Sequence, residues 1–503
     1  MNKTLSSHAL IKAFSFGVLF FTLEAKAVEP VQVGSKAFTE SVILGEMATQ
    51  LGNDAGIRTV HRSQLGGTRI LWNALISGQI DAYPEYTGTI VQELLPGADP
   101  KLDLLRKELA SRGVGMTRAL GFNDTYALGM LEKSADDLKI RTIGDLASHP
   151  ELRFGFSNEF LERKDGWPAV RNAFRLPQEN VTGLDHDLAY RAISTGKTDL
   201  IDLYSTDAEI AFYHLRVLED DKAFFPKYDA AFLYRLDLEE RAPSFIRSLR
   251  RLEGQVTATQ MIQMNAASKL EKRSEASVAA AFLRDRLQIR TTLRETTLFS
   301  IFLLRTKEHL LLVVTSLALS ILFAVPLGVL AYARPRFGHA ILALVAAIYT
   351  IPSLALLVFM IPLFGIGTLP AVVALFLYGL LPIVRNTHTG LAGISPALRE
   401  SAIVLGLSPM ARLIKIELPL AAPSIAAGIK TAAVINVGTA TLGALIGAGG
   451  YGQPILTGIR LADNSLILLG AVPAAALALL VQSGFGALER ITLPRGLRLK
   501  VRS

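Results

Sequence analysis

Residues 400–419 read ESAIVLGLSPMARLIKIELP, and this stretch decides how the C-terminal half of the chain is organised. A glutamate is followed by small residues and then by Gly406, so a first short helix is expected to break at this glycine. A second, amphipathic helix is expected over 409–417, and it should stop before Pro419 because proline lacks the N–H that a helix interior uses. The pattern predicts a compact helical projection, with an ordinary pair of interfacial helices as the alternative.

Long apolar segments surround this projection and predict a transmembrane domain over 309–491. The candidate spans, about five in number, are 309–332, 339–364, 370–384, 423–446 and 466–485. Basic residues gather in the loop 385–420 and in the tail 492–503, which predicts that both lie in the cytoplasm. The net charge of +8 is therefore a membrane-orientation signal. Membrane lipid is the expected surrounding, and no nucleic-acid partner is expected.

The N-terminal half reads as a water-soluble protein over 28–289, with charges every few positions. Val31 to Ser35 predicts a first strand and turn, and short β-like runs then alternate with amphipathic helices such as 184–194. This alternation predicts an α/β domain with mostly parallel sheets, ending in a helix over 274–287. Its length, together with the absence of a catalytic motif, favours a two-lobed binding protein over an enzyme. Residues 290–308 would tether it to the membrane.

The first 27 residues resemble an export signal. Lys3 and Lys12 form a basic start, 13–23 is a short apolar core, and Ala25 and Ala27 fit the small-residue pattern of a cleavage site. An uncleaved anchor is the alternative, although the apolar core is shorter than the ~20 residues that cross a bilayer. Export would place the binding domain outside the cytoplasmic membrane. The chain has no cysteine, so it forms no disulfide and no thiolate metal site.

Two motifs that suggest nucleotide binding are excluded by their context. Gly196, Lys197 and Thr198 end like a phosphate-binding loop, but Arg191 stands where the leading glycine belongs. The glycine-rich run 447–452 follows an apolar span and not a strand, so it predicts a turn at the outer membrane face. The histidines show no paired ligand spacing. We therefore expect no catalytic residues, no metal, no cofactor and no ATP hydrolysis by this chain itself.

Several segments of the apolar half carry a family resemblance. The stretch 400–419 resembles the EAA motif of ABC importer permeases, with Ser401 in place of the second-position alanine. The segments 309–311, 326–328, 351–357, 381–387 and 449–452 are similar to permeases of the glycine betaine, choline and carnitine osmoprotectant importers. The resemblance implies an all-α fold of the methionine-importer type, a homodimer around the transport path, and a separate cytoplasmic ATPase. The residues that would couple to the ATPase are Glu400, Ser401, Ala402, Gly406, Ile416, Leu418 and Pro419.

The soluble half resembles the osmoprotectant-binding proteins, through the segments 34–40, 81–89, 121–126, 202–207 and 225–228. This resemblance implies a periplasmic-binding-protein-like domain of type II that closes two lobes over a quaternary ammonium group. Such a group donates no conventional N–H hydrogen bond, so aromatic rings must hold it by cation–π attraction. We expect the rings of Tyr86, Tyr126, Tyr204 and Tyr228, with Asp124 as a nearby anion. Tyr83 is an alternative to Tyr86, and lobe packing is the alternative role for each tyrosine.

Three further residues match positions that resemble the carboxylate-holding set of betaine binders: Lys36, Thr89 and Arg163. An arginine is suited to bidentate capture of a carboxylate. An ordinary solvated surface charge is the alternative for the two cations. If all three face the cleft, a zwitterion such as glycine betaine is favoured over choline, which has no carboxylate. Carnitine and ergothioneine carry both groups and stay open.

The sequence thus predicts the permease and binding component of an ATP-driven importer for a small, glycine betaine-like solute, in a bacterial cytoplasmic (inner) membrane. The binding domain would face the periplasm or the exterior. Import of ergothioneine or another small solute by the same architecture is an alternative. A ligand-gated receptor or channel is a rival of another class, but it predicts a signalling domain or a selectivity loop that the chain does not show. Export by a related permease is disfavoured by the external binding domain.

Overall fold

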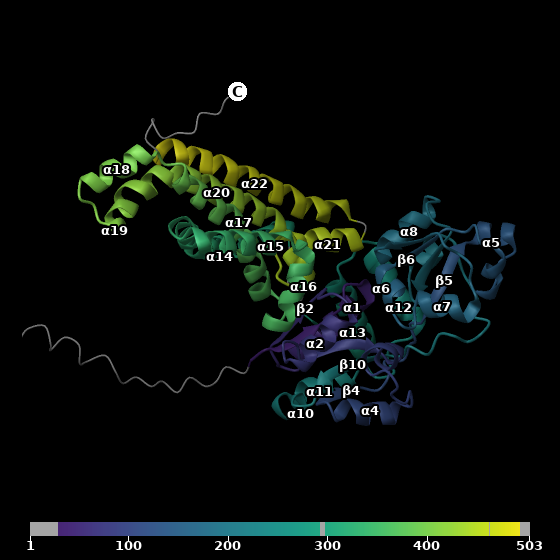
Figure 1. Ribbon diagram of the computed structural model, residues 1–503. Helices are drawn as coiled ribbons and strands as arrows, with labels where there is room; N and C mark the ends of the chain where they lie inside the picture. The colour runs from purple at the N-terminus through teal and green to yellow at the C-terminus, as the bar shows by residue number, and fades with distance from the viewer. Residues whose placement is uncertain (1–28, 292–296, 462, 493–503) are drawn as a thin grey trace, which may run out of the picture. The chain divides into compact units, whose positions relative to one another are not determined.

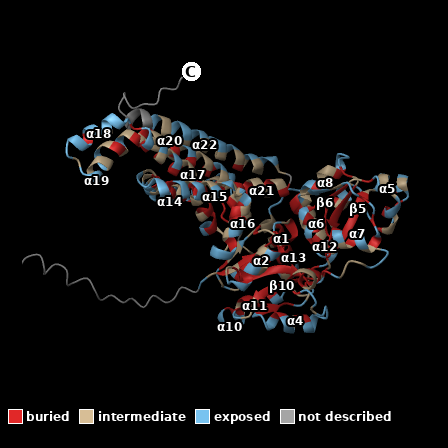
Figure 2. Cartoon of the chain, viewed as in Figure 1, coloured by how far each residue is buried: buried red, intermediate tan, exposed pale blue. Residues whose placement is uncertain are grey.

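The computed structural model describes residues 29–291, 297–461 and 463–492 (Figure 1). The expected signal peptide, and the expected tail beyond Thr492, lie outside these residues. Within them the expected two-lobed α/β domain, followed by an all-α domain, is confirmed. The expectation of mostly parallel sheets is wrong, because in each lobe one strand, β10 (Ala230–Arg235) or β5 (Tyr126–Leu131), runs antiparallel to both of its neighbours. Figure 2 shows buried residues concentrated in the sheets of the α/β half and along the inner faces of the long helices.

The first lobe is built on a five-stranded sheet of order β2-β1-β3-β10-β4. Its strands are β1 (Val31–Gly34), β2 (Thr59–Arg62), β3 (Ala82–Tyr86), β4 (Val114–Met116) and β10 (Ala230–Arg235). Strand β1 pairs in parallel with β2 and β3, whereas β10 runs antiparallel to β3 and β4. Its helical segments are α1 (Thr39–Asp54), α2 (Thr68–Ile76), α3 (Thr87–Thr89), η1 (Ile90–Leu94), α4 (Leu102–Ala110), α10 (Leu238–Arg241), α11 (Pro243–Arg250), α12 (Ala258–Lys269) and α13 (Glu275–Leu287).

The second lobe has a sheet of order β7-β6-β8-β5-β9. Its strands are β5 (Tyr126–Leu131), β6 (Phe154–Ser157), β7 (Val181–Leu184), β8 (Leu200–Tyr204) and β9 (Leu215–Val217), and its helical segments are α5 (Glu132–Leu138), η2 (Gly144–Ser148), α6 (Asn158–Glu162), α7 (Trp167–Phe174), α8 (His186–Ser194) and α9 (Glu209–Phe212). The chain enters this lobe between β4 and β5 and leaves it between β9 and β10. These two crossings place side chains from both lobes around one interlobe cleft, as expected for α/β domains of this kind.

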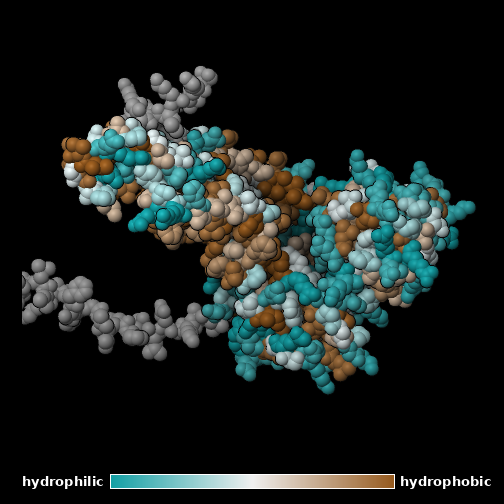
Figure 3. All heavy atoms as spheres, in the orientation of Figure 1, coloured by the Kyte–Doolittle hydropathy of each residue, from teal (hydrophilic) through white to brown (hydrophobic). Residues whose placement is uncertain are grey.

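The helical half comprises α14 (Leu298–Ala333), α15 (Pro335–Thr350), α16 (Ser353–Phe364), α17 (Thr368–Ala392), α18 (Pro396–Val404), α19 (Pro409–Arg412), η3 (Leu413–Glu417), α20 (Leu418–Thr439), η4 (Ala440–Ile446), α21 (Gly452–Arg460) and α22 (Asn464–Thr492). Among the described residues four helices are long and apolar enough to cross a membrane, or up to five if one bent pair counts as a span. Apolar side chains cover much of this half, while hydrophilic ones cover the α/β half (Figure 3).

The bent pair changes the expected form of one span, since the two helices are long and apolar enough to cross only when taken together. The segment 339–364 was expected to form a single span, but α15 and α16 meet at an angle of 99°. The break falls at Ile351, whose backbone is extended, next to Pro352. Proline disfavours the helical conformation of the residue before it, so the helix ends there. The first span also begins earlier than expected, at Leu298, within the segment expected to be a tether.

A second correction concerns Pro419, which does not stop a helix. The structure runs from α19 through η3 directly into α20, and Pro419 lies in the first turn of α20. Within a continuous helical run, the missing N–H of a proline leaves one preceding carbonyl without its usual donor. The π-type turn of η3 adjusts the hydrogen-bond register just before it. The projection is therefore continuous with the following span.

Candidate functional site: an aromatic cavity and an exposed helix pair

A single cavity between the two lobes contains all eight residues expected to bind the substrate. The lining residues are Lys36, Phe38, Tyr86, Thr89, Asp124, Tyr126, Glu159, Arg163, Tyr204 and Tyr228. They come from the loop after β1, from β3 and α3, from the first crossing and β5, from α6, from β8, and from the second crossing. Their roles stay predictions, but the fold brings them together. Tyr83, the alternative to Tyr86, is buried outside this cavity, in another cluster of the first lobe.

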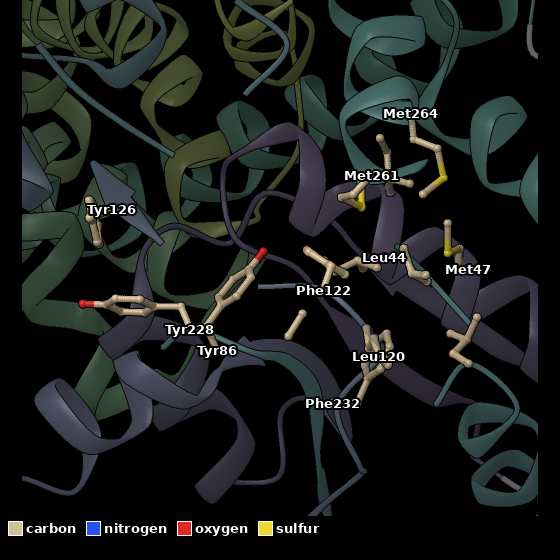
Figure 4. Close-up of a cluster of buried hydrophobic side chains, with 14 of the residues drawn as sticks. Leu44, Met47, Tyr86, Leu120, Phe122, Tyr126, Tyr228, Phe232, Met261 and Met264 are labelled. Atoms are coloured by element: carbon tan, nitrogen blue, oxygen red, sulfur yellow. The ribbon is translucent and has the colours of Figure 1, made fainter. Parts of the chain in front are cut away.

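Aromatic rings form most of the cavity wall. The ring centroid of Tyr126 lies 5.0 Å from that of Tyr204 and 5.8 Å from that of Tyr228. Phe38 lies 5.6 Å from Tyr204 and 6.2 Å from Tyr86. Figure 4 shows Tyr86, Tyr126 and Tyr228 gathered at one end of the buried cluster, away from its methionines. Five π faces around one small space can hold a cation that lacks hydrogen-bond donors.

The electrostatic state of the rings suits this task. Burial raises the pKa of Tyr86, Tyr126, Tyr204 and Tyr228 above the ordinary phenol value, so these hydroxyls stay protonated. Gly88 makes room for one ring, because a β-carbon there would lie 2.5 Å from the Tyr228 ring. The family-matching segment 81–89 therefore supplies both a ring and the space for another.

The two cations of the cavity are already paired with carboxylates. Lys36 Nζ lies 2.6 Å from Glu85 Oε1. The Arg163 guanidinium donates to both oxygens of Asp165, at 2.7 and 2.6 Å. Both pairs are buried, so each cation has its charge compensated within the protein. Neither cation is a solvated surface charge, which was the alternative reading.

Sequence reasoning missed two lining residues, Phe38 and Glu159. Phe38 lies in the family-matching segment 34–40, two residues after Lys36, and Glu159 lies four residues before Arg163. The signal for Phe38 was an aromatic side chain within the motif 34–40. The Glu159 carboxylate lies 3.6 Å from Arg163, one helical turn away on α6 and its C-cap. Helical spacing alone could have identified that pair.

The expected ATPase-coupling residues lie on a helix pair that is largely exposed. Glu400, Ser401 and Ala402 belong to α18, and Gly406 follows with φ of +76°, which favours glycine. Ile416 lies in η3, and Leu418 and Pro419 begin α20. A shallow groove is lined by Ala397, Glu400, Ser401, Val404 and Leu405. Val404 and Leu405 are 87% and 77% exposed, so apolar surface is displayed here rather than packed.

A buried glutamate ties the two parts of this helix pair together. Glu417 lies 3.1 Å from Arg412 and 3.7 Å from Arg399, which belongs to α18. The Arg399 guanidinium in turn lies 5.0 Å from the centre of the Tyr332 ring, at the end of α14. This network links the exposed surface to a long apolar helix. Sequence reasoning quoted Glu417 within the motif without assigning it this role.

A two-lobed domain with an interlobe cavity, joined to a set of long apolar helices with an exposed helix pair, defines the class of binding-protein-dependent membrane transporters. Residues 29–285 match the substrate-binding domain of ABC-type glycine betaine transport systems, and residues 320–492 match the inner-membrane component of binding-protein-dependent transport systems. The chain belongs to this family, with both components fused. It is a multi-pass inner-membrane transporter subunit with an extracytoplasmic binding domain, and it works with a partner ATPase and a small-molecule substrate.

Individual relatives match either half. The choline transport system permease protein OpuBB of Bacillus subtilis (strain 168) is 43% identical over 199 residues, covering 39% of this chain and 92% of OpuBB. The ergothioneine transport permease/ergothioneine binding protein EgtU of Helicobacter pylori (strain G27) is 33% identical over 264 residues, covering 51% of this chain and 47% of EgtU. A solved glycine betaine/carnitine/choline ABC transporter structure is 29% identical, with a TM-score of 0.44, covering 51% of this chain and 98% of that one.

Proposed function

We propose that the chain imports a small quaternary ammonium compatible solute, glycine betaine-like, as the permease and binding component of an ATP-driven importer. The observation that carries this proposal is the cavity wall of five aromatic rings beside Asp124. Each ring face contributes about 0.5–2 kcal/mol to the binding of a quaternary ammonium, more when water is excluded.

The presence of Lys36, Thr89 and Arg163 in the same cavity supports a substrate with a carboxylate. Arg163 lies 5.1 Å over the Tyr126 ring, next to the space where an ammonium group would lie. One observation favours choline as a second candidate. Both cations are already compensated by Glu85 and Asp165, so a substrate carboxylate would share them rather than meet a free charge. Ergothioneine is a third candidate, because EgtU, named as an ergothioneine permease and binding protein, is 33% identical to this chain over 264 residues.

The binding test uses the full chain in lipid nanodiscs. Calorimetric titration with glycine betaine, choline, carnitine and ergothioneine should show tight binding of at least one. Preference for glycine betaine over choline supports the carboxylate role of Lys36 and Arg163, and the reverse preference assigns the cavity to a plain cation. Absence of binding to all four contradicts the quaternary ammonium assignment while leaving the importer class intact.

The transport cycle we propose uses both regions. The lobes close on the solute, the domain presents it to the pore of a homodimer, and two ATPase subunits engage the α18–η3 helix pair and switch the spans. The exposed apolar residues of α18 and its C-terminal turn support this engagement, since removing them from water would stabilise a docked ATPase. Fusion keeps the binding domain at high effective concentration near the pore, which offsets a modest docking affinity. The dimer is testable by the mass of the detergent-purified chain.

A further inference from the structure

A second buried acid, Glu40, lies beside the aromatic cavity without a role in the function proposed above. It is on α1 in the first lobe and makes three hydrogen-bond contacts. The Tyr86 hydroxyl donates to Oε1 at 2.6 Å, the Asn265 amide donates to Oε2 at 3.2 Å, and the Thr206 hydroxyl lies 2.6 Å from Oε2. Glu40 therefore holds one ring of the cavity wall in place and reaches across to Thr206 of the second lobe.

The Thr206 hydroxyl is also within hydrogen-bond distance of Asp124, at 2.8 Å from Oδ1. A hydroxyl has one proton and can donate only one hydrogen bond of full strength. If both carboxyl groups were ionised, one of the two short contacts would bring oxygen lone pairs together with no proton between them. Both contacts are satisfied when one carboxyl is protonated and donates to Thr206, which then donates to the other carboxylate. Both short contacts of the Thr206 hydroxyl can therefore be hydrogen bonds only when one of the two carboxyl groups carries a proton.

Among the described residues, no cation near Glu40 and Asp124 is free to stabilise them if both were ionised. Lys36, beside Tyr86, is paired with Glu85. Lys269, on α12 next to Asn265, is paired with Asp187 and Glu209 at 2.7 and 2.6 Å. Asp207, the nearest other acid, is paired with His186 at 3.0 Å, and that imidazole also lies 3.9 Å from Asp202. Arg163, across the cavity, is paired with Asp165. Each cation that faces the region from the neighbouring elements is thus compensated by its own acid.

Burial and mutual repulsion agree with this arrangement. Burial raises the pKa of Glu40 from 4.5 to about 7, against the lowering effect of its hydrogen bonds. Burial, and then the charge of Glu40, raise the pKa of Asp124 well above its ordinary value. Two carboxyl groups that share a site titrate as a pair, and one of them keeps its proton to a higher pH.

The contacts exist only while the lobes are together. Glu40 and Asn265 belong to the first lobe, Thr206 follows β8 in the second, and Asn265 also donates to the Thr206 carbonyl at 3.0 Å. In an open domain the two carboxyl groups would be separated and hydrated. We propose that Glu40 and Asp124 share one proton through Thr206 in the closed domain, so that capture of the substrate is coupled to proton uptake. This proposal rests on the function proposed above, since Asp124 faces the substrate cavity and Glu40 does not.

The direction in which substrate affinity changes with pH follows from the raised pKa of Glu40 in the closed form. A bound cation beside Asp124 favours the state in which Asp124 is ionised and Glu40 holds the proton. The closed form binds the proton more tightly than the open form, so affinity is greatest at low pH. It falls as the pH rises from the ordinary glutamate value of 4.5 to about 7, and it levels off above that. The slope is at most about tenfold in Kd per pH unit.

The first experiment measures the Kd of the full chain in nanodiscs for choline and for glycine betaine from about pH 5 to about pH 8. Calorimetry in buffers of different ionisation enthalpy counts the protons taken up. We expect uptake approaching one proton at about pH 6, lost in Glu40→Gln. Glu108→Gln, an exposed glutamate on α4, is the matched control and should keep the wild-type profile. A wild-type Kd that does not change with pH, or a Glu40→Gln profile identical to wild type, would overturn the proposal.

A second experiment needs no ligand and separates the failure of this proposal from failure of the proposed function. The chain has no cysteine, so Glu93→Cys and Lys164→Cys can be bridged with a bifunctional maleimide. The Lys164 backbone N–H donates to Glu93 across the lobes, so the bridge holds the closed form. Infrared spectroscopy at about pH 6 should show the carbonyl band of a protonated carboxyl, lost in Glu40→Gln and in Asp124→Asn. A band that is absent, or that survives either substitution, contradicts a shared proton even if neither solute binds.

Discussion

The cavity of the binding domain and the α18–η3 helix pair differ in which side chains they bury: the cavity buries charged groups, and the helix pair exposes apolar ones. In the cavity, both cations, Lys36 and Arg163, are buried and paired with carboxylates, and the rings contact one another. On the helix pair, apolar side chains such as Val404 and Leu405 are exposed, and only Glu417 is buried between arginines. The cavity lining comes from one chain, whereas the helix pair leaves apolar surface exposed.

This difference teaches where each function should fail. A cavity whose lining comes from one chain should lose affinity when one of its own contacts is removed, with or without an ATPase. Substitutions on the exposed helix pair should change no measured property until the ATPase is present. Substitutions in the two regions are therefore expected to separate binding from transport, and the following predictions test that separation in order of expected size.

Tyr204→Ala should raise the Kd for the bound solute about tenfold to a hundredfold. The ring contacts Tyr126 and Phe38, and its loss removes a cation–π face and buried apolar area. Tyr213→Ala is the matched control, because Tyr213 stacks on Tyr190 outside the cavity. Calorimetry on the full chain gives both values. Equal loss in the two variants would mean that Tyr204 serves only lobe packing.

Leu405→Asp should lower ATP-driven uptake about tenfold or more while the Kd for the solute stays unchanged. The introduced aspartate would replace an exposed leucine and place a charge in the ATPase interface, which is unfavourable once water is excluded. Leu104→Asp, at an exposed position on α4 of the binding domain, should leave uptake intact. The measurements are solute uptake by proteoliposomes that contain the ATPase and, for the same variants, the Kd for the solute. Normal uptake by Leu405→Asp would refute docking at this surface.

Lys269→Met should weaken binding about tenfold or less by destabilising the closed domain. Lys269 on α12 compensates Asp187 and Glu209 of the second lobe, and its removal leaves two buried carboxylates unpaired. Asp187 and Glu209 are hydrated in the open form, so the free-energy cost of leaving them unpaired arises mainly when the domain closes. Arg112→Met, which breaks the exposed pair with Glu108, serves as control and should change the Kd little. An unchanged Kd in Lys269→Met would exclude this ion-pair cluster from closure.

Gly406→Ala should have the smallest effect, a decrease in uptake of up to about fivefold. A β-carbon at Gly406 meets nothing within 4 Å, so the cost is the φ of +76°, about 1 kcal/mol for alanine. Gly484→Ala on α22 also enters open space but without a positive φ, and it should leave uptake unchanged. The same rate in both variants would show that the turn after α18 need not be rigid.

The sequence predicted much of this molecule because its signals are local. The alternation of strands and helices, the apolar helices and the break at Gly406 all depend on neighbouring residues. The four tyrosines and Asp124 were found because each lies in a short segment that resembles a binding family, although their roles remain predictions. The break before Pro352 could also have been predicted, since the restriction that proline imposes on its predecessor is local.

The interactions that sequence reasoning missed are mostly nonlocal or depend on register. Glu85 pairs with Lys36 from a different strand, and Thr206 bridges Glu40 and Asp124 from the other lobe, so no spacing rule reveals them. Asp165 is the exception, because it follows Arg163 closely and its bidentate pairing was within reach of sequence reasoning. Pro419 was misjudged because a π-type turn before a helix has no clear sequence pattern.

The contact between the tyrosine rings has a consequence for selectivity by size. Tyr126 and Tyr204 lie at a centroid distance of 5.0 Å and contact one another, so an ion that came between them would have to separate the two rings. Aromatic pairs lose about 0.5–1.5 kcal/mol when parted. A bulky, weakly hydrated ammonium group regains this through several new faces, whereas potassium would also have to give up its water shell. A wall of this kind would therefore favour weakly hydrated organic cations over strongly hydrated inorganic ions.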